Sequence, residues 1–108
     1  MEVAVTGWIY LFLAALFEIG WAVGLKYTDG FTRPLPSLLT AASMVASLAL
    51  LGLAVKTLPL GTAYAIWTGI GVVGTVALGT VLLGEPMSAL RVFCVAMILL
   101  GVVGLKLA

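Results

Sequence analysis

The chain has 108 residues, of which 64% are hydrophobic and only 8% are charged, and its formal net charge is +1. Soluble domains carry about a quarter charged residues, so this composition and a mean hydropathy of +1.32 indicate that the solvent of the chain is lipid. Because it has no His, one Cys and no basic cluster, we expect no enzyme, no metal, no cofactor and no nucleic-acid partner.

Four apolar stretches are each long enough to cross a bilayer as a helix, which takes about 20 residues. Residues 34–55 and 57–84 carry no charge, the first stretch is interrupted only by Glu18, and the last only by Arg91. We predict an all-α membrane protein in which residues 1–108 form one domain. Its spans are residues 7–25, 34–55, 62–83 and 87–105. The short loops make consecutive spans antiparallel, and the first span lacks the basic start of a secretory signal, so we expect it to be retained.

The positive charges do not decide the orientation of these spans. One side of the membrane would carry Lys56 and Lys106, and the other Lys26, Arg33 and Arg91. Counting the N-terminal amine levels the two sides, so the positive-inside rule predicts insertion in both orientations. The alternative is that the hydrophobicity of the first span fixes one orientation. Because transporters pair repeats of opposite orientation around a midplane site, a second, inverted copy would be the partner.

Glu18 is the acid within the first span. It follows Trp8 by ten residues, which places it about 15 Å along a hydrocarbon layer about 30 Å thick. An ionisable group near the midplane indicates a functional site, the alternative being a structural carboxyl that stays protonated or paired. Lipid disfavours the charged carboxylate, whereas a bound cation favours it. Proton and cation would therefore compete for Glu18, and such competition is what antiport requires.

Aromatic residues are expected around this acid. Trp21 follows Glu18 by three residues and shares its helix face, where an indole can stack on a flat cation. The alternative for Trp21 is the interfacial aromatic belt. Tyr64 and Trp67 are also three apart and offer a hydroxyl and a π face, although pairs at this spacing also serve packing.

Small residues suggest further contacts between the spans. Ser43 and Ser47 lie four apart and can bond either their own helix or a polar neighbour across the interface. The glycines of residues 69–74 suggest a flexible or kinked point in the third span. Gly101 and Gly104 offer a small-residue face for helix pairing.

These residues together resemble a known family. Glu18, residues 25–34 (LKYTDGFTRP) and above all residues 61–71 (GTAYAIWTGIG) make the chain similar to the small multidrug resistance family along nearly its whole length. Within that family, residues 18–26 (EIGWAVGLK) and residues 104–106 (GLK) resemble the guanidinium exporter subtype rather than the polyaromatic drug exporters.

The resemblance implies an antiparallel, dual-topology homodimer in the bacterial inner membrane that exports guanidinium in exchange for protons at Glu18. It also implies that Gly69 and Gly71 bend the third helix and that the fourth helix dimerises. The implied neighbours of Glu18 are Trp21, Tyr64, Trp67 and Ser47, the last as a hydrogen-bond partner of the acid. Gly20 departs from the pattern, since a larger aliphatic residue is common there, which loosens the inference about substrate size.

Guanidinium chemistry agrees with this implication, because the ion is planar, always charged and matches a carboxylate through two parallel hydrogen bonds. Two other functions stay open at this point. One is a broader exporter of quaternary ammonium compounds or substituted guanidinium ions, whose alkyl tail would extend between helices into lipid. The other is a non-transporting membrane accessory subunit, which would not need an ionisable Glu18. It also stays open whether a different chain replaces the second copy as partner.

Overall fold

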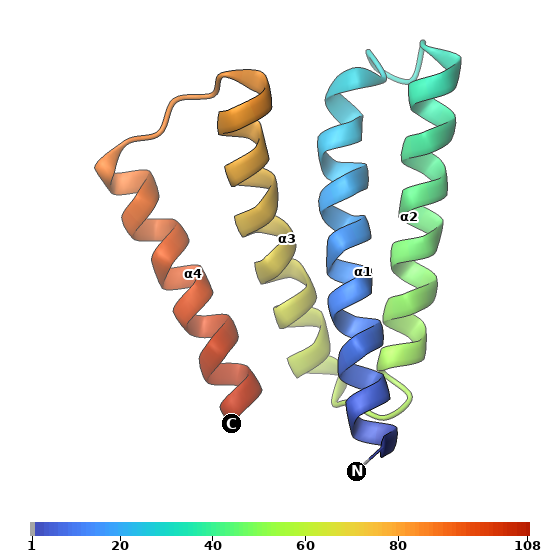
Figure 1. Cartoon of the computed structure of the whole chain (residues 1–108), viewed down its shortest axis with the longest axis vertical. Coiled ribbons are helices and arrows are strands. Elements are labelled where there is room, and N and C mark those ends of the chain that lie inside the picture. The colour runs from blue at the N-terminus through green and yellow to red at the C-terminus, as the bar shows by residue number, and fades with distance from the viewer. Residues whose placement is uncertain (1) are drawn as a thin grey trace.

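The computed structural model describes residues 2–108, with side chains from Val5 onward. The helices are α1 (Glu2–Tyr27), α2 (Pro34–Ala54), α3 (Leu60–Leu83) and α4 (Ala89–Leu107). Each is long and apolar enough to cross a membrane. The predicted all-α architecture with four potential membrane spans is therefore confirmed. The beginning of α1 and the end of α4 lie at the same end of the molecule (Figure 1).

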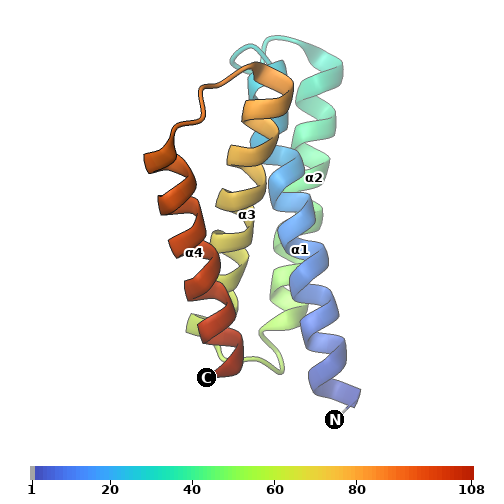
Figure 2. The same ribbon diagram turned by 60° about the vertical axis from the view of Figure 1, so that its left-hand side comes forward.

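The helices stand in one layer, in the order α2, α1, α3, α4 (Figures 1 and 2). The molecule measures 43 × 36 × 17 Å, and its smallest dimension is little more than the 10–12 Å diameter of one helix. Its accessible surface is 6728 Å², compared with about 5,700 Å² expected for a compact soluble protein of this mass. Both broad faces of the layer are thus uncovered in the single chain.

The helix ends follow local sequence signals. Proline at the start of α2 fits a helix N-terminus, where the missing N–H costs nothing, and Arg33 before it is extended. Gly84 ends α3 in the left-handed region at φ 67°, a conformation that suits glycine. The Ser88 hydroxyl accepts a hydrogen bond of 3.2 Å from the backbone N–H of Arg91. This N-cap starts α4 at Ala89, two residues after the predicted start of the last span.

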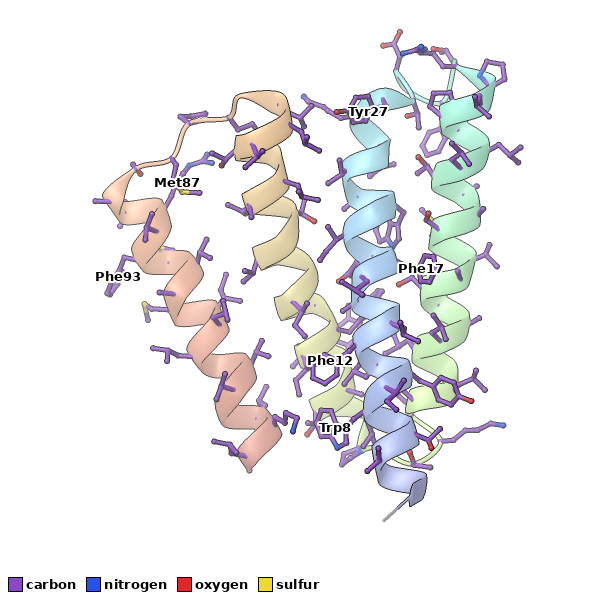
Figure 3. The ribbon with its side chains drawn as sticks, in the orientation of Figure 1. Trp8, Phe12, Phe17, Tyr27, Met87 and Phe93 are labelled. Atoms are coloured by element: carbon purple, nitrogen blue, oxygen red, sulfur yellow. The ribbon has the colours of Figure 1, made fainter. Side chains whose placement is uncertain are left out.

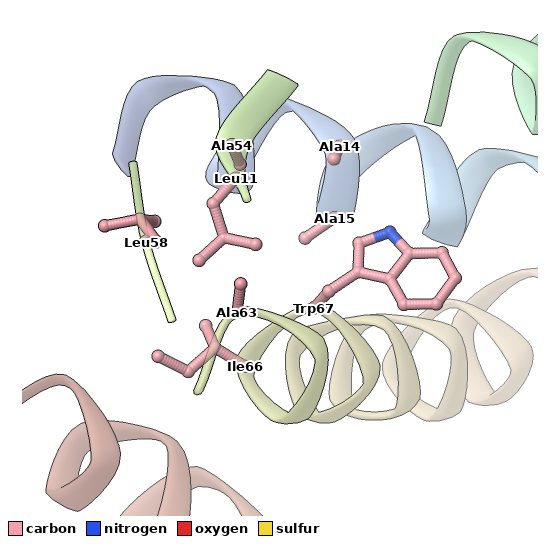
Figure 4. Packing of buried hydrophobic residues seen from close by; sticks show 8 residues of the cluster. All are labelled: Leu11, Ala14, Ala15, Ala54, Leu58, Ala63, Ile66 and Trp67. Carbon is pink, nitrogen blue, oxygen red and sulfur yellow. The ribbon is translucent and has the colours of Figure 1, made fainter. Parts of the chain in front are cut away.

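The apolar core occupies only the half of the layer that lies toward the two termini. Small side chains of α1 allow α3 to approach closely there, and the Trp67 ring lies at one end of this core (Figure 4). The buried members are Leu11, Ala14, Ala15, Ala54, Leu58, Ala63, Ile66 and Trp67. Along α1 the core ends at Ala15, about one turn before Glu18.

Glycines of α3 serve as contact points for its neighbours. A Cβ at Gly69 would overlap Val102 of α4, and a Cβ at Gly74 would overlap Ile19 of α1. α3 remains helical from Leu60 to Leu83, through the segment that the sequence marks as a kink. In this structure the glycines of residues 69–74 let α1 and α4 pack closely on α3.

Helix α4 packs against α3 and, within the part of the chain whose side chains are described, none of its residues is buried. The Phe93 side chain is 62% exposed and projects away from the other helices (Figure 3). Gly101 and Gly104 are exposed, and a Cβ on either would meet nothing within 4 Å. At the C-terminal end, the Lys106 ammonium lies 5.0 Å from the centroid of the Trp8 ring. The outer face of α4 is therefore a free apolar surface.

Candidate functional site

A cavity of about 270 Å³ lies between α1 and α3, just beyond the apolar core. Its walls come from one face of each of these two helices. The lining residues are Glu18, Trp21, Ala22, Thr68, Gly71, Val72, Thr75 and Val76. Glu18 is the acidic residue of this lining, and no basic side chain belongs to it. The site is thus an apolar chamber with one carboxyl group.

Three polar atoms of this lining are buried without a hydrogen-bond partner: Glu18 Oε1, Trp21 Nε1 and Thr68 Oγ1. A threonine in a helix commonly bonds the carbonyl four residues earlier, as Thr80 does to Val76 O at 3.0 Å. Thr68 does not, so its hydroxyl remains available to the cavity. A buried unpaired polar group costs about 1–3 kcal/mol. Three of them around one cavity therefore point to an occupant that pairs with them.

Gly71 allows Glu18 to lie where it does. A Cβ built at Gly71 would overlap the Glu18 carboxyl group. The carboxyl therefore lies directly against the backbone of α3, at a position that only glycine leaves open. This close approach sets the acid at the α1–α3 interface.

The α3 side of the cavity was not predicted from the sequence. Thr68, Gly71, Val72 and Thr75 follow the spacing i, i+3, i+4, i+7 that marks one helix face. Hydroxyls repeated on that face were the signal that could have identified Thr68 and Thr75. Tyr64 and Trp67, the aromatic residues of the same helix, are not part of this lining.

Ser47 and Trp67 form a buried pair beside the cavity rather than in its lining. Ser47 is fully buried and donates its hydroxyl hydrogen to Ala14 O at 2.6 Å. The indole N–H of Trp67 in turn donates to Ser47 Oγ at 3.0 Å. The hydrogen bond from Ser47 to Glu18 that the resemblance implied is not formed here, because the only hydroxyl hydrogen is used by Ala14. The pair fixes the Trp67 ring at the boundary between core and cavity.

Tyr64 and Ser43 lie elsewhere. The Tyr64 side chain is 56% exposed, and its ring packs on Trp67 with centroids 5.6 Å apart at 40°. Ser43 lines a separate hollow of about 330 Å³ between α1 and α2, together with Gly20 and Gly24. Of the predicted neighbours of Glu18, only Trp21 lines its cavity. Gly71, which the sequence marks as a bend in the third helix, lines it as well.

The described residues offer nothing to hold a metal ion. Within residues 5–108, no three His, Cys, Asp or Glu side chains come close enough to share one. The chemistry available to the cavity is the binding and release of a cation or a proton by one carboxyl, beside an indole and a hydroxyl.

Comparisons with known proteins agree along nearly the whole chain. Residues 6–98 match the model of a family described as Small Multidrug Resistance protein. A protein of Proteus vulgaris named guanidinium exporter is 56% identical over 101 residues, which cover 94% of this chain and 97% of that protein. Proteins of the same name are 55% identical in Escherichia coli K12, where 96% of the relative is covered, and 56% in Yersinia pseudotuberculosis, where 97% is covered.

Proposed function

The chain belongs to the small multidrug resistance family, and from this premise we propose that it exports guanidinium in exchange for protons, with both ions binding at Glu18. With four helices able to span a membrane, it is a multi-pass protein of the bacterial inner membrane. The relatives are named as exporters rather than as enzymes. The observation that carries the proposal is the unpartnered Glu18 carboxyl oxygen in a cavity between α1 and α3.

Guanidinium fits this cavity in size and in chemistry. It has four non-hydrogen atoms, which occupy on the order of 100 Å³ if each takes roughly the volume share of one water, so a cavity of about 270 Å³ holds it with room to spare. Its parallel N–H groups match the two oxygens of the Glu18 carboxylate. The spare volume beside Val72 and Val76 would accept a short alkyl substituent.

The other two unpaired atoms suit a bound planar cation. The Thr68 hydroxyl oxygen accepts a hydrogen bond from a guanidinium N–H that does not reach Glu18. The Trp21 indole offers its π face to the ion, and its N–H can donate to the carboxylate. Trp67 and Ser47 support the wall of the cavity, and we assign them a positioning role.

Coupling follows from the single carboxyl. A proton neutralises Glu18 and removes its attraction for the cation, whereas a bound cation stabilises the carboxylate and repels the proton. The proton and the cation therefore cannot occupy Glu18 at the same time. Exchange of one ion for the other results if the protein reorients while loaded and seldom while empty.

The functional unit in this proposal is an antiparallel homodimer, in which each chain contributes residues 1–108 as one membrane domain. Three features support it. The layer leaves the Glu18 side and the outer face of α4 without cover, Gly101 and Gly104 are open to close approach, and the balanced positive charges permit insertion in both orientations. A second inverted copy would close the cavity and cover Tyr64.

Vesicle transport tests the proposal. Purified protein in liposomes, with an internal pH dye, should move protons outward when guanidinium is supplied outside, and Glu18→Gln should abolish this movement while the variant still purifies as wild type. Competition with a lipophilic quaternary ammonium ion separates the broader exporter, which would bind that ion far more tightly than guanidinium. Normal exchange by Glu18→Gln would refute the assignment of the site.

A further inference from the structure

A second hollow continues from the Glu18 cavity toward the loop that joins α3 to α4. It has a volume of about 280 Å³, and Ala22 and Thr75 line both spaces. Lys26, Gly79 and Glu85 also line it. We call this space the loop-side vestibule.

The two spaces follow each other in the same direction along both helices. On α1 the cavity is lined by residues from Glu18 to Ala22, and the vestibule by residues from Ala22 to Lys26. Lys26 lies about 12 Å from Glu18 along the helix axis. On α3 the vestibule continues from Thr75 past Gly79. The α1–α3 groove is thus hollow from Glu18 to the end of the helices.

The chain fixes Glu85 at the outer end of this groove. Gly84 turns the backbone at φ 67°, and the Glu85 N–H then donates to Gly79 O at 3.2 Å. A Cβ at Gly79 would overlap the Glu85 carboxyl group. The missing side chain of Gly79 therefore leaves room for that carboxyl, which lies against α3 and lines the vestibule on an otherwise exposed residue.

Lys26 lines the same space and carries the opposite charge. No ion pair is formed between it and Glu85 among the residues that the structure describes, although both belong to one lining. The four-carbon stem of lysine lets its ammonium reach lipid phosphates, whereas the Glu85 carboxyl lies against Gly79 of α3. The vestibule thus keeps a carboxylate that is free for another cation.

We propose that the loop-side vestibule is an outer binding site for small planar cations on the path to Glu18, and that Glu85 is the carboxylate that binds them there. This inference rests on the proposed function and adds to it the route and the first contact of the substrate. In an antiparallel dimer each copy would present its vestibule to one side of the membrane, so both faces would have the same access route.

The first test is the kinetics of guanidinium exchange by Glu85→Gln in liposomes. A unit charge about 5 Å away in water changes the local concentration of a monovalent cation about fourfold, so kcat/KM should fall by roughly that factor at low salt, with kcat unchanged. Asp29→Asn removes the same charge from the other loop at this end and should leave kcat/KM unchanged. The difference should shrink in 0.5 M salt, at which charges are screened within about 5 Å.

A double-mutant cycle tests whether the position of the Glu85 carboxyl depends on the absence of a side chain at Gly79. Gly79→Ala should displace the carboxyl and reproduce the effect of Glu85→Gln, and the two changes together should have no more effect than either alone. Gly52→Ala in α2, where a Cβ meets nothing within 4 Å, is the matched control. Equal effects of Asp29→Asn and Glu85→Gln, or additive effects of Gly79→Ala and Glu85→Gln, would overturn the proposal. If Glu85→Gln is inactive, rescue by Glu85→Asp supports it and failure of rescue overturns it.

A labelling experiment needs no transport. Thr75→Cys, made in a Cys94→Ser and Glu18→Gln chain, should react with a cationic thiol reagent, and millimolar guanidinium should slow the reaction. Adding Glu85→Gln should remove this protection. Protection that persists without Glu85 would overturn the vestibule site and leave the assignment of Glu18 intact, whereas normal exchange by Glu18→Gln would refute the proposed function whatever the labelling shows.

Discussion

The Ser47–Trp67 pair leads to a quantitative prediction. Ser47→Ala removes the hydroxyl that donates to Ala14 O at 2.6 Å and accepts from Trp67 Nε1 at 3.0 Å. The lost donation is worth about 1 kcal/mol, and the indole N–H left buried without a partner adds about 1–3 kcal/mol. We expect Ser47→Ala to lower the free energy of unfolding by about 2–4 kcal/mol.

The pair can be isolated with Trp67→Phe, which removes the indole N–H. Because the orphaned donor no longer exists in the double variant, the combined loss should be smaller than the sum of the single losses by about 1–2 kcal/mol. Unfolding in mixed micelles of rising SDS content, followed by the fluorescence of Trp8 and Trp21, measures the free energy of unfolding of the wild type, both single variants and the double variant. Ser43→Ala is the control, since that half-buried hydroxyl makes no hydrogen bond within residues 5–108, and it should cost less than about 0.5 kcal/mol.

Strict additivity of Ser47→Ala and Trp67→Phe would refute this reasoning, because it would mean that the two side chains do not share a bond. A loss below 0.5 kcal/mol for Ser47→Ala would refute it as well.

Three further predictions concern the cavity and the free face of α4. Gly71→Ala should weaken guanidinium binding at least tenfold, because its Cβ would overlap the Glu18 carboxyl, whereas Gly61→Ala on the same helix meets nothing within 4 Å and should bind normally; isothermal titration checks both. Thr68→Val keeps the shape and removes the hydroxyl, and should weaken binding about fivefold to tenfold without lowering stability; unchanged affinity would exclude Thr68 from the site. Gly101→Leu should shift the protein from dimer to monomer in a crosslinking assay, and an unaltered dimer would show that this face is not the interface.

The helices themselves could be predicted from the sequence, because length and apolar character decide whether a segment can span lipid. Local signals also set some ends, as Gly84 does for α3 and Ser88 for α4. Which face of a helix meets which neighbour was not predictable. Between Gly7 and Leu25, α1 carries no charged residue apart from Glu18, so no polar stripe distinguishes the side that packs on α2 from the side that packs on α3.

The candidate site could likewise be predicted from the sequence only in part. The midplane position of Glu18 and its spacing to Trp21 follow from helix geometry alone, and both line the cavity. Ser47 and Trp67 are close in space, but the sequence does not say that Ala14 O takes the serine hydrogen. That outcome depends on how closely α1 and α2 approach. The sequence does not single out Thr68, because a helical threonine usually bonds its own backbone, and only the structure shows that this one does not.

The central claim is that a cation and a proton compete for Glu18. Isothermal titration of guanidinium into the purified protein, at several pH values and in buffers of different ionisation enthalpy, measures this directly. Where Glu18 is protonated before binding, each bound guanidinium should release one proton, and the affinity should fall up to tenfold for each unit of acidification. Glu18→Gln should show neither effect. A wild-type affinity that is constant with pH, with no buffer-dependent heat, would contradict the account.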